Sequence, residues 1–369
     1  MLRIDRDIFI HFDYILPLLL LPVIFMSYFL VNELHPTLAD KQLIYFSIAL
    51  VTFVFFFLLP IRKLLWMIPL FYWINIILLV SVQFFGVTKL GAKRWLEIPF
   101  LNFTIQPSEI MKISFILMLG YLITTNPPDK EKGYGVVDFM KLSVYIFIPF
   151  VLILIQPDLG TALILLIMGF GVLFVVGVNY KVWLSVLVLV SVSIPLIYSS
   201  LYDYQKKRIS DFIGEKPSYH VRQSIIAIGS GGLSGQEESE ATQSHLKFLP
   251  IATSDFIFAF YVERFGFWGG VILIVIYTLV ILHLLMIFLY LKGDYLTQVV
   301  ASSLAFLFFL YTSVNIAMTI GYAPVVGLPL PLFSYGGSSF ITFIILLGIL
   351  ENLLTFRHDT LYDSIKYGD

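Results

Sequence analysis

"FWGGVILIVIYTLVILHLLMIFLYL", residues 267–291, is a run of 25 residues without a single Asp, Glu, Lys or Arg. A helix needs about 20 apolar residues to cross the hydrocarbon core of a bilayer, so this stretch is long enough to span one. The whole chain shares this bias, with 59% hydrophobic and 13% charged residues. Soluble domains have roughly 45–50% apolar residues and about 25% charged residues. The sequence therefore predicts an integral membrane protein.

Ten such runs recur along the chain of 369 residues. They predict an all-α integral membrane protein with about ten transmembrane helices in a single polytopic domain, 1–369. A long polar and aromatic segment, 203–266, separates the seventh run from the eighth and is expected to form a large loop. The first run lacks a small-residue cleavage site, which is typical of a retained span. The expected spans are 14–32, 42–60, 64–85, 107–125, 142–156, 160–177, 180–202, 267–291, 296–320 and 338–356.

The distribution of Lys and Arg predicts which side of the membrane each short loop faces. With the N-terminus in the cytoplasm, eleven of these cations lie on the cytoplasmic side and four lie in the short outer loops. We therefore expect both termini in the cytoplasm and the loop 203–266 on the outer face. The eleven are Arg3, Arg6, Arg62, Lys63, Lys130, Lys132, Lys141, Lys181, Lys292, Arg357 and Lys366, and the four are Lys41, Lys89, Lys93 and Arg94.

Charge balance and the absence of cysteine exclude several classes of function. A formal net charge of -1, from 23 basic and 24 acidic residues, leaves no basic stripe for a nucleic-acid backbone. The chain has no cysteine, which excludes disulfides, thiolate catalysis and zinc–thiolate sites. The glycines of "SIIAIGSGGLSG", residues 224–235, match neither the phosphate-loop nor the dinucleotide-binding pattern and predict a tight turn.

Ionisable residues inside predicted spans are candidates for function, because each costs roughly 2.5–3.5 kcal/mol at the bilayer centre. Glu109 and Lys112 lie three residues apart at the start of one span and are expected to pair on one helical face. The pair is either a salt bridge that lets a helix tolerate two charges, or a pair that faces a polar cavity. Asp158 is likewise either a helix cap or a cavity residue. Glu351 is expected to face the interface without a role.

The outer stretch "KLGAKRWLEIPFLNFTIQPSE", residues 89–109, carries three cations against the charge bias. One interpretation is a loop that caps the bundle while its cations contact lipid headgroups. The other is an anion site, in which Arg94 binds a phosphate with two parallel hydrogen bonds while the indole of Trp95 lies at the interface.

Asp255 stands between apolar and aromatic residues in "HLKFLPIATSDFIFAFYVERFGFWGG", residues 245–270. The stretch predicts a short helix that begins near Asp255 and lies in the interface. An Asp in the first turn of a helix is usually a cap, which the helix dipole favours. A carboxylate at a membrane surface, screened from bulk water, is also a good candidate for a general base. Both interpretations stay open at the level of the residues.

Six motifs occur along nearly the whole chain, namely "GAKRW", "QPSEIMK", "QPDLGTA", "QSIIAIGSGGLSG", "TQSHLKFLPIATSDFIFA" and "NIAMTIGYAPVVGLPLPLFSYGGSSF". Together, and in this order, they resemble the motifs of the SEDS family (shape, elongation, division and sporulation), which includes RodA and FtsW. The short ends of the chain resemble the RodA branch more than the FtsW branch.

The resemblance implies a peptidoglycan glycosyltransferase of the bacterial cytoplasmic membrane. Such an enzyme polymerises lipid II into β-1,4 glycan strands at the outer face, for cell elongation and rod shape. It implies Asp255 as the catalytic acid of the outer loop. The substrate-binding residues that it implies are Arg94, Trp95, Glu109, Lys112, Asp158, Lys247 and Ser334. The chain departs from the family pattern at 251–254, so no role is assigned to Ile251. It also departs at 237–241, so no backbone contact with substrate is expected from that stretch.

The resemblance also implies partners, namely a class B penicillin-binding protein that crosslinks the strands and other membrane proteins of the elongation complex. A divalent cation, Mg²⁺ or Mn²⁺, could stabilise the leaving pyrophosphate, and no organic cofactor is expected.

Two rival functions use the same sequence features. A flippase or transporter of lipid-linked cell-wall precursors would need the broken segments near 156–160 and 323–337 and the charges inside the spans. The chain shows no internal hydropathy repeat that would favour it. A scaffold that only recruits partners would leave the charges unexplained.

Overall fold

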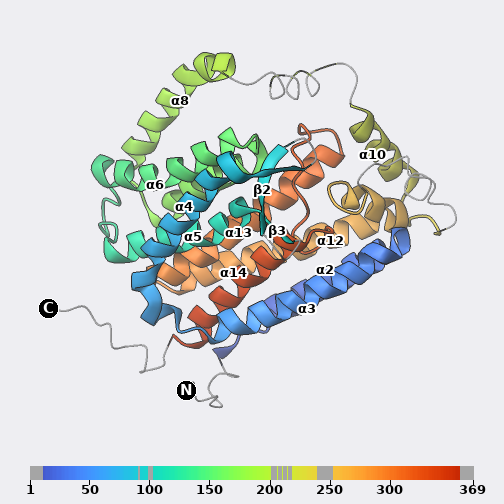
Figure 1. The fold of residues 1–369 in the computed structure, drawn as a ribbon, viewed down its shortest axis with the longest axis horizontal. Coiled ribbons are helices and arrows are strands. Elements are labelled where there is room, and N and C mark those ends of the chain that lie inside the picture. The colour runs from blue at the N-terminus through green and yellow to red at the C-terminus, as the bar shows by residue number, and fades with distance from the viewer. Residues whose placement is uncertain are drawn as a thin grey trace.

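The computed structural model describes residues 11–89, 92–98, 103–200, 206, 210, 214, 218–238 and 252–357. Helices dominate this part of the chain (Figure 1). They are α2 (Ile15–Leu34), α3 (Pro36–Leu58), α4 (Ile68–Phe85), α5 (Pro107–Thr125), α6 (Val136–Ile155), α7 (Leu159–Val176), α8 (Tyr180–Ser200), α10 (Tyr219–Ser230), α12 (Ile257–Tyr290), α13 (Tyr295–Thr319) and α14 (Gly337–Thr355), with a 3-10 helix, η1 (Ile61–Met67), leading into α4.

Nine helical segments in the described part of the chain are long and apolar enough to cross a membrane. They coincide with nine of the ten predicted spans. The remaining predicted span, 180–202, corresponds to α8 over its described residues, and the apolar part of this helix is shorter and runs from Tyr180 to Pro195. Side chains of α8 such as Leu187 and Val192 are exposed, and in Figure 1 the helix extends away from the other helices.

The core of the bundle lies around α5 and α13. Of the residues in the most apolar stretch of each helix, 72% are buried in α5 and 67% in α13, whereas only 11% are buried in α3. The two helices pack against each other, and α7 and α14 also pack on both. A helix surrounded by other helices can hold charged residues away from lipid, so α5 and α13 are where polar residues can be placed at membrane depth.

A small antiparallel sheet follows α4, in the order β1-β2-β3. Its strands are β1 (Val87–Lys89), β2 (Ala92–Ile98) and β3 (Phe103–Ile105). The described chain is mostly helical, as the all-α prediction states, and this small sheet is a local exception in the stretch that was interpreted as a loop. Strand pairing satisfies backbone groups that a loop packed on the bundle would leave without partners.

The predicted interfacial helix and the predicted span 267–291 are consecutive parts of α12, separated by a kink at Gly266 with φ 66°. The turn after α10 closes the gap in the helical hydrogen bonds: Phe267 N–H donates to the carbonyl of Gly232 at 2.9 Å, and Trp268 N–H to that of Leu233 at 3.3 Å. A Cβ on Gly235 would lie 2.2 Å from the carbonyl oxygen of Arg264. The predicted tight glycine turn is confirmed, and the backbone that it approaches is the kink of α12.

The first and last described segments of the chain meet at one end of the bundle. The Asp13 N–H donates to Glu351 Oε1 at 2.6 Å, so α2 begins where α14 ends. This agrees with termini on one side of the membrane, while the assignment of that side to the cytoplasm stays a prediction. Glu351 is only 3% exposed, so the prediction that it faces the interface was wrong. Its carboxylate is buried in the core, where it accepts the hydrogen bond from the Asp13 N–H.

Candidate functional site

Asp255 lies in a turn, 252–256, just before α12. Two buried side chains hold the backbone of this turn. Asn315 of α13 donates to the carbonyl of Asp255 at 2.9 Å and to that of Leu328 at 2.6 Å. The hydroxyl of Ser334 donates to the carbonyl of Ser254 at 2.6 Å. The turn is thus fastened to α13 and to the irregular segment 320–336, which fixes the position of Asp255.

The carboxylate of Asp255 faces Gly327 of that segment. A Cβ built on Gly327, whose φ is 71°, would lie 3.5 Å from Asp255 Oδ2. Burial raises the pKa of the Asp255 carboxyl above its usual value, and a hydrogen bond with Ser254 opposes this shift. Loss of hydration disfavours the charged form of an acid, so the group holds a proton more tightly than a solvated Asp.

Helix capping does not account for Asp255. The N-cap of α12 is Phe256, and no side chain caps this end of the helix. Nor do the ion pairs among the described residues include one to Asp255. The structure therefore does not support the cap, and the role of Asp255 as a general base stays a prediction.

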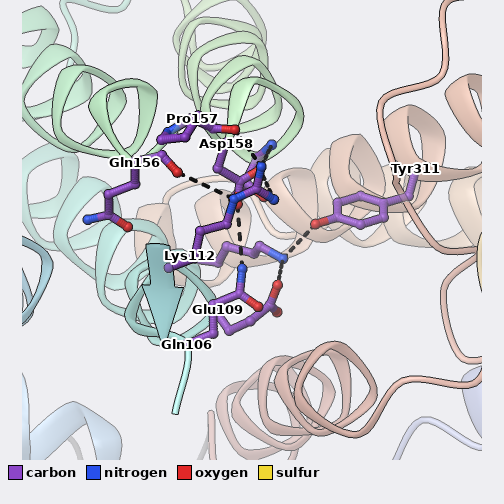
Figure 2. A network of polar contacts seen from close by, with 9 residues as sticks. Gln106, Glu109, Lys112, Gln156, Pro157, Asp158 and Tyr311 are labelled. Atoms are coloured by element: carbon purple, nitrogen blue, oxygen red, sulfur yellow. Dashed lines mark hydrogen bonds and ion pairs between the residues drawn. The ribbon is translucent and has the colours of Figure 1, made fainter. Parts of the chain in front are cut away.

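Glu109 and Lys112 form the predicted pair on α5, with 2.7 Å between Lys112 Nζ and Glu109 Oε1. The ammonium also donates to the Tyr311 hydroxyl of α13 at 2.5 Å (Figure 2). Lys112 is completely buried. Of the two alternatives, the buried salt bridge describes Lys112, because Glu109 and Tyr311 enclose its ammonium group; the predicted role of the pair in substrate binding stays a prediction.

Arg94 extends from β2 to the loop between α6 and α7. Its guanidinium donates to the carbonyl of Gln156 at 3.3 Å and to that of Pro157, and lies 3.6 Å from Asp158 Oδ1. Asp158 is the N-cap of α7 and accepts from Thr161 N–H at 3.3 Å. Asp158 thus acts as the predicted cap. The donors of Arg94 are directed to protein groups, so its predicted contact with an anion stays a prediction.

The groups around Asp255, Lys112 and Asp158 adjoin one another. Tyr311, which contacts Lys112, and Asn315, which holds the turn of Asp255, are four residues apart on α13 and so lie on one helical face. A Cβ on Gly160, at the start of α7, would lie 3.1 Å from the carbonyl oxygen of Val326, next to Gly327. One end of the bundle therefore brings together most of the predicted site residues.

The remaining predicted residues have other outcomes. Trp95 lies half-buried in β2, where it pairs with Val87. Ser334 is 5% exposed, and its hydroxyl accepts from Leu330 N–H while donating to Ser254. Its hydroxyl positions the turn of Asp255 in this way, and its predicted role in substrate binding stays a prediction. Lys247 lies outside the described residues.

The sequence reasoning missed Tyr311 and Asn315, and also Gln106, whose amide lies 3.5 Å from Asp158 Oδ2 (Figure 2). The signal for the first two was a pair of polar residues four apart in an apolar span, which predicts a polar stripe facing the bundle interior.

No group of three or more His, Asp or Glu side chains within the described ranges could hold a metal ion. A divalent cation can also be held by one or two carboxylates together with substrate phosphates, so the expected Mg²⁺ or Mn²⁺ stays a prediction.

Comparisons with known proteins identify the family of this chain. The family model for FtsW, RodA and SpoVE, described as "Cell cycle protein", matches residues 7–359. A peptidoglycan glycosyltransferase MrdB of Helicobacter pylori is 53% identical over 363 residues, which cover 98% of this chain and 95% of the relative. MrdB of Escherichia coli is 41% identical over 298 residues and covers 78% of each chain.

Solved structures share the fold. The rod shape determining protein RodA of Thermus thermophilus has a TM-score of 0.70 at 25% identity, over 94% of this chain and 98% of that one. A chain from work on "Structural coordination of polymerization and crosslinking by a peptidoglycan synthase complex" has a TM-score of 0.81 at 24% identity. The match covers 94% of this chain and 99% of that chain. This chain is a multi-pass membrane protein, and it belongs to the SEDS family of FtsW and RodA.

Proposed function

We propose that this chain is a peptidoglycan glycosyltransferase that polymerises lipid II into β-1,4 glycan strands at the outer face of the bacterial cytoplasmic membrane. The names of its relatives support the reaction class, since both MrdB proteins are called peptidoglycan glycosyltransferases and the first is 53% identical over nearly the full length. The identity to MrdB also supports a role in cell elongation and rod shape.

In the proposed reaction, the 4-hydroxyl of an incoming lipid II attacks the anomeric carbon of the growing glycan. The bond from that carbon to the pyrophosphate oxygen breaks, and undecaprenyl pyrophosphate leaves with both electrons of the bond. The proton of the attacking hydroxyl passes to Asp255, which acts as general base. Such transfer contributes about 10²- to 10⁴-fold to a rate.

A single observation carries this assignment: Asp255 is an acid with a fixed backbone and no ion-pair partner among the described residues. Its raised pKa brings the carboxylate closer in basicity to the hydroxyl that it must deprotonate, and Brønsted behaviour favours such a base. A carboxylate neutralised by a cation would be a weaker proton acceptor.

Arg94, Glu109, Lys112 and Asp158 have supporting roles in the proposal. The Lys112–Glu109–Tyr311 group joins α5 to α13, and Arg94 joins the sheet to the start of α7. These contacts position the elements that surround the substrate. Arg94 is 24% exposed in its side chain, which leaves it accessible to the leaving pyrophosphate, where a guanidinium can stabilise developing negative charge.

We further propose a class B penicillin-binding protein as partner. The structural neighbour with a TM-score of 0.81 comes from work on a peptidoglycan synthase complex that coordinates polymerization with crosslinking, and the match covers 94% of this chain. A shared fold over that length leaves the same outer surfaces available for such a partner.

Reconstitution into liposomes with fluorescent lipid II tests the reaction. The proposal predicts glycan polymers, resolved by gel electrophoresis and digested by a muramidase, when the chain is present with its transpeptidase. Transfer of lipid II across the bilayer without any polymer would contradict the proposal and favour the flippase.

A further inference from the structure

A cavity of about 970 Å³ lies at the opposite end of the bundle from Asp255. The connections α5–α6, α7–α8 and α12–α13 form it, whereas the candidate site lies at the starts of α5, α7 and α12. The 18 residues of α7 separate the two places, which at 1.5 Å per residue is roughly 27 Å. The proposed glycosyl transfer uses none of the residues that line this cavity.

Positive charge converges on the cavity from all three connections. Its lining includes four lysines, Lys130, Lys132, Lys181 and Lys292, and two acids, Asp129 and Glu131. The carboxylate of Asp129 accepts from the backbone N–H groups of Glu131 and Lys132, each at 2.9 Å. Within the described ranges, none of the four ammonium groups takes part in an ion pair. Asp129 and Glu131 offset part of this charge, and Asp129 interacts electrostatically with Lys132, but four lysines against two acids leave the lining with an excess of two positive charges, which would attract an anion.

The walls of the cavity are fixed by backbone contacts. Tyr134 N–H donates to the carbonyl of Gly177 at 3.0 Å, and Asn179 N–H donates to the carbonyl of Tyr134 at 3.1 Å. Gly133 packs so closely that a Cβ there would lie 2.9 Å from the Gly177 carbonyl oxygen. These contacts fix the α5–α6 connection relative to the α7–α8 connection. The backbone positions of the lysines on the two connections are therefore fixed relative to each other.

The residues around the cavity indicate that it lies at the level of the lipid headgroups. Tyr180, which lines the cavity, is 73% exposed, and Tyr290, at the end of α12, is 89% exposed. Tyrosines gather at the level of the headgroups, where one end of the ring is apolar and the other is hydrated. Next to them, α8 presents exposed apolar side chains such as Leu184 and Leu187, along which acyl chains can lie.

We propose that this cavity is a binding site for the phosphate headgroup of an anionic phospholipid. The ammonium groups of Lys130, Lys132, Lys181 and Lys292 surround the phosphate oxygens, while the acyl chains pass out along α7 and α8 into the bilayer. By the charge bias of its loops, this end of the protein is expected to face the cytoplasm. Basic pockets between helices on that side are suited to anionic headgroups.

Native mass spectrometry of the purified full-length protein tests the site, with cardiolipin, phosphatidylglycerol and zwitterionic phosphatidylethanolamine as probes. The test variant is Lys181→Gln/Lys292→Gln, which removes one lysine from each of two connections. The control is Lys63→Gln/Lys141→Gln, which removes the same charge outside the cavity lining. Lys181→Arg/Lys292→Arg keeps the charge and serves as rescue. Thermal unfolding without added lipid checks that all variants fold.

We expect the cavity variant to bind cardiolipin and phosphatidylglycerol about tenfold or more weakly, because each lost lysine weakens attraction to an anionic lipid. The control and the arginine variant should bind like the parent, and phosphatidylethanolamine should bind weakly to all. An equal loss in the control variant would overturn the site in favour of general surface attraction. Displacement of the lipid by millimolar inorganic phosphate, at unchanged lipid concentration, would overturn the lipid as ligand and indicate a soluble anion.

Discussion

Two acids at the same end of the bundle, Glu109 and Asp255, have opposite surroundings. Glu109 is 8% exposed, and its Oε1 lies 2.7 Å from the ammonium group of Lys112. Asp255 is half-buried, without an ion-pair partner in the described part of the chain, and burial raises the pKa of its carboxyl. The charge of Glu109 is balanced by Lys112, so this acid stabilises the packing around α5. Asp255 has no such cation among the described residues and costs energy to ionise, so its carboxylate accepts a proton more readily.

The largest effect on stability is expected at the paired acid. Lys112→Met leaves the Glu109 carboxylate buried without its cation, which typically costs about 3–5 kcal/mol. The double variant Glu109→Gln/Lys112→Met removes both charges and should recover much of that loss. Thermal unfolding in detergent measures all three proteins. A single variant as stable as the parent would show that the pair is not needed for the fold.

A smaller effect is expected where Asn315 holds the turn of Asp255. Asn315→Ala leaves the carbonyls of Asp255 and Leu328 without their donor, at about 1–3 kcal/mol for such an unsatisfied buried group. It should also lower kcat with little change in KM, since Asp255 loses its fixed position. The lipid II polymerisation rate, measured over a range of substrate concentrations, separates the two constants.

Asn352→Ala provides a matched control for Asn315→Ala. Asn352 of α14 is also buried and donates to two backbone carbonyls, of Phe57 at 2.6 Å and of Leu59 at 2.8 Å, but lies at the other end of the bundle. It should cost similar stability and leave kcat of the folded protein unchanged. Equal losses of kcat in both variants would reduce the role of Asn315 to general stability.

A smaller effect again is expected at Arg94. Arg94→Lys keeps the charge but loses the planar fork that reaches the carbonyls of Gln156 and Pro157, so polymerisation should fall about tenfold. Arg62→Lys is the control, because Arg62 also contacts a carboxylate and a carbonyl, those of Asp294 and Leu353, away from the site. Unchanged turnover by Arg94→Lys would exclude both positioning and pyrophosphate binding by the guanidinium.

The sequence predicted the parts of this protein that follow from local chemistry. The apolar runs located nine spans, although α3 and α6 begin six residues before the predicted starts at 42 and 142, and α12 begins ten residues before the predicted start at 267. The spacing of three identified the Glu109–Lys112 pair. What it could not predict depends on contacts distant in sequence. The enclosure of Lys112 needs Tyr311, 199 residues away, and the engagement of Arg94 needs the loop at 156–158. The sheet was missed because its strands are short, two of them only three residues long, and lie in a segment that mixes cations with apolar residues, which also suits an interfacial loop.

The smallest effect concerns pH. Because burial raises the pKa of Asp255 above its usual value, the carboxyl is protonated, and unable to act as a base, up to a higher pH than a solvated Asp. The polymerisation rate should therefore rise with pH through that raised pKa and level off above it. Asp255→Glu should shift the acidic limb of the rate profile, whereas Asn352→Ala should not. A profile unaffected by Asp255→Glu would assign the limb to another group.

The most direct test of the central claim is Asp255→Asn, which removes the proton acceptor and keeps the size of the side chain. An acid with a raised pKa in the folded protein destabilises the fold once the pH exceeds its unfolded value, so the neutral amide should be at least as stable as the parent at pH 7. We predict a folded protein that still associates with its transpeptidase and polymerises lipid II about 10²-fold or more slowly. A folded variant that retains more than about a tenth of the parental rate would contradict the assignment of Asp255 as general base.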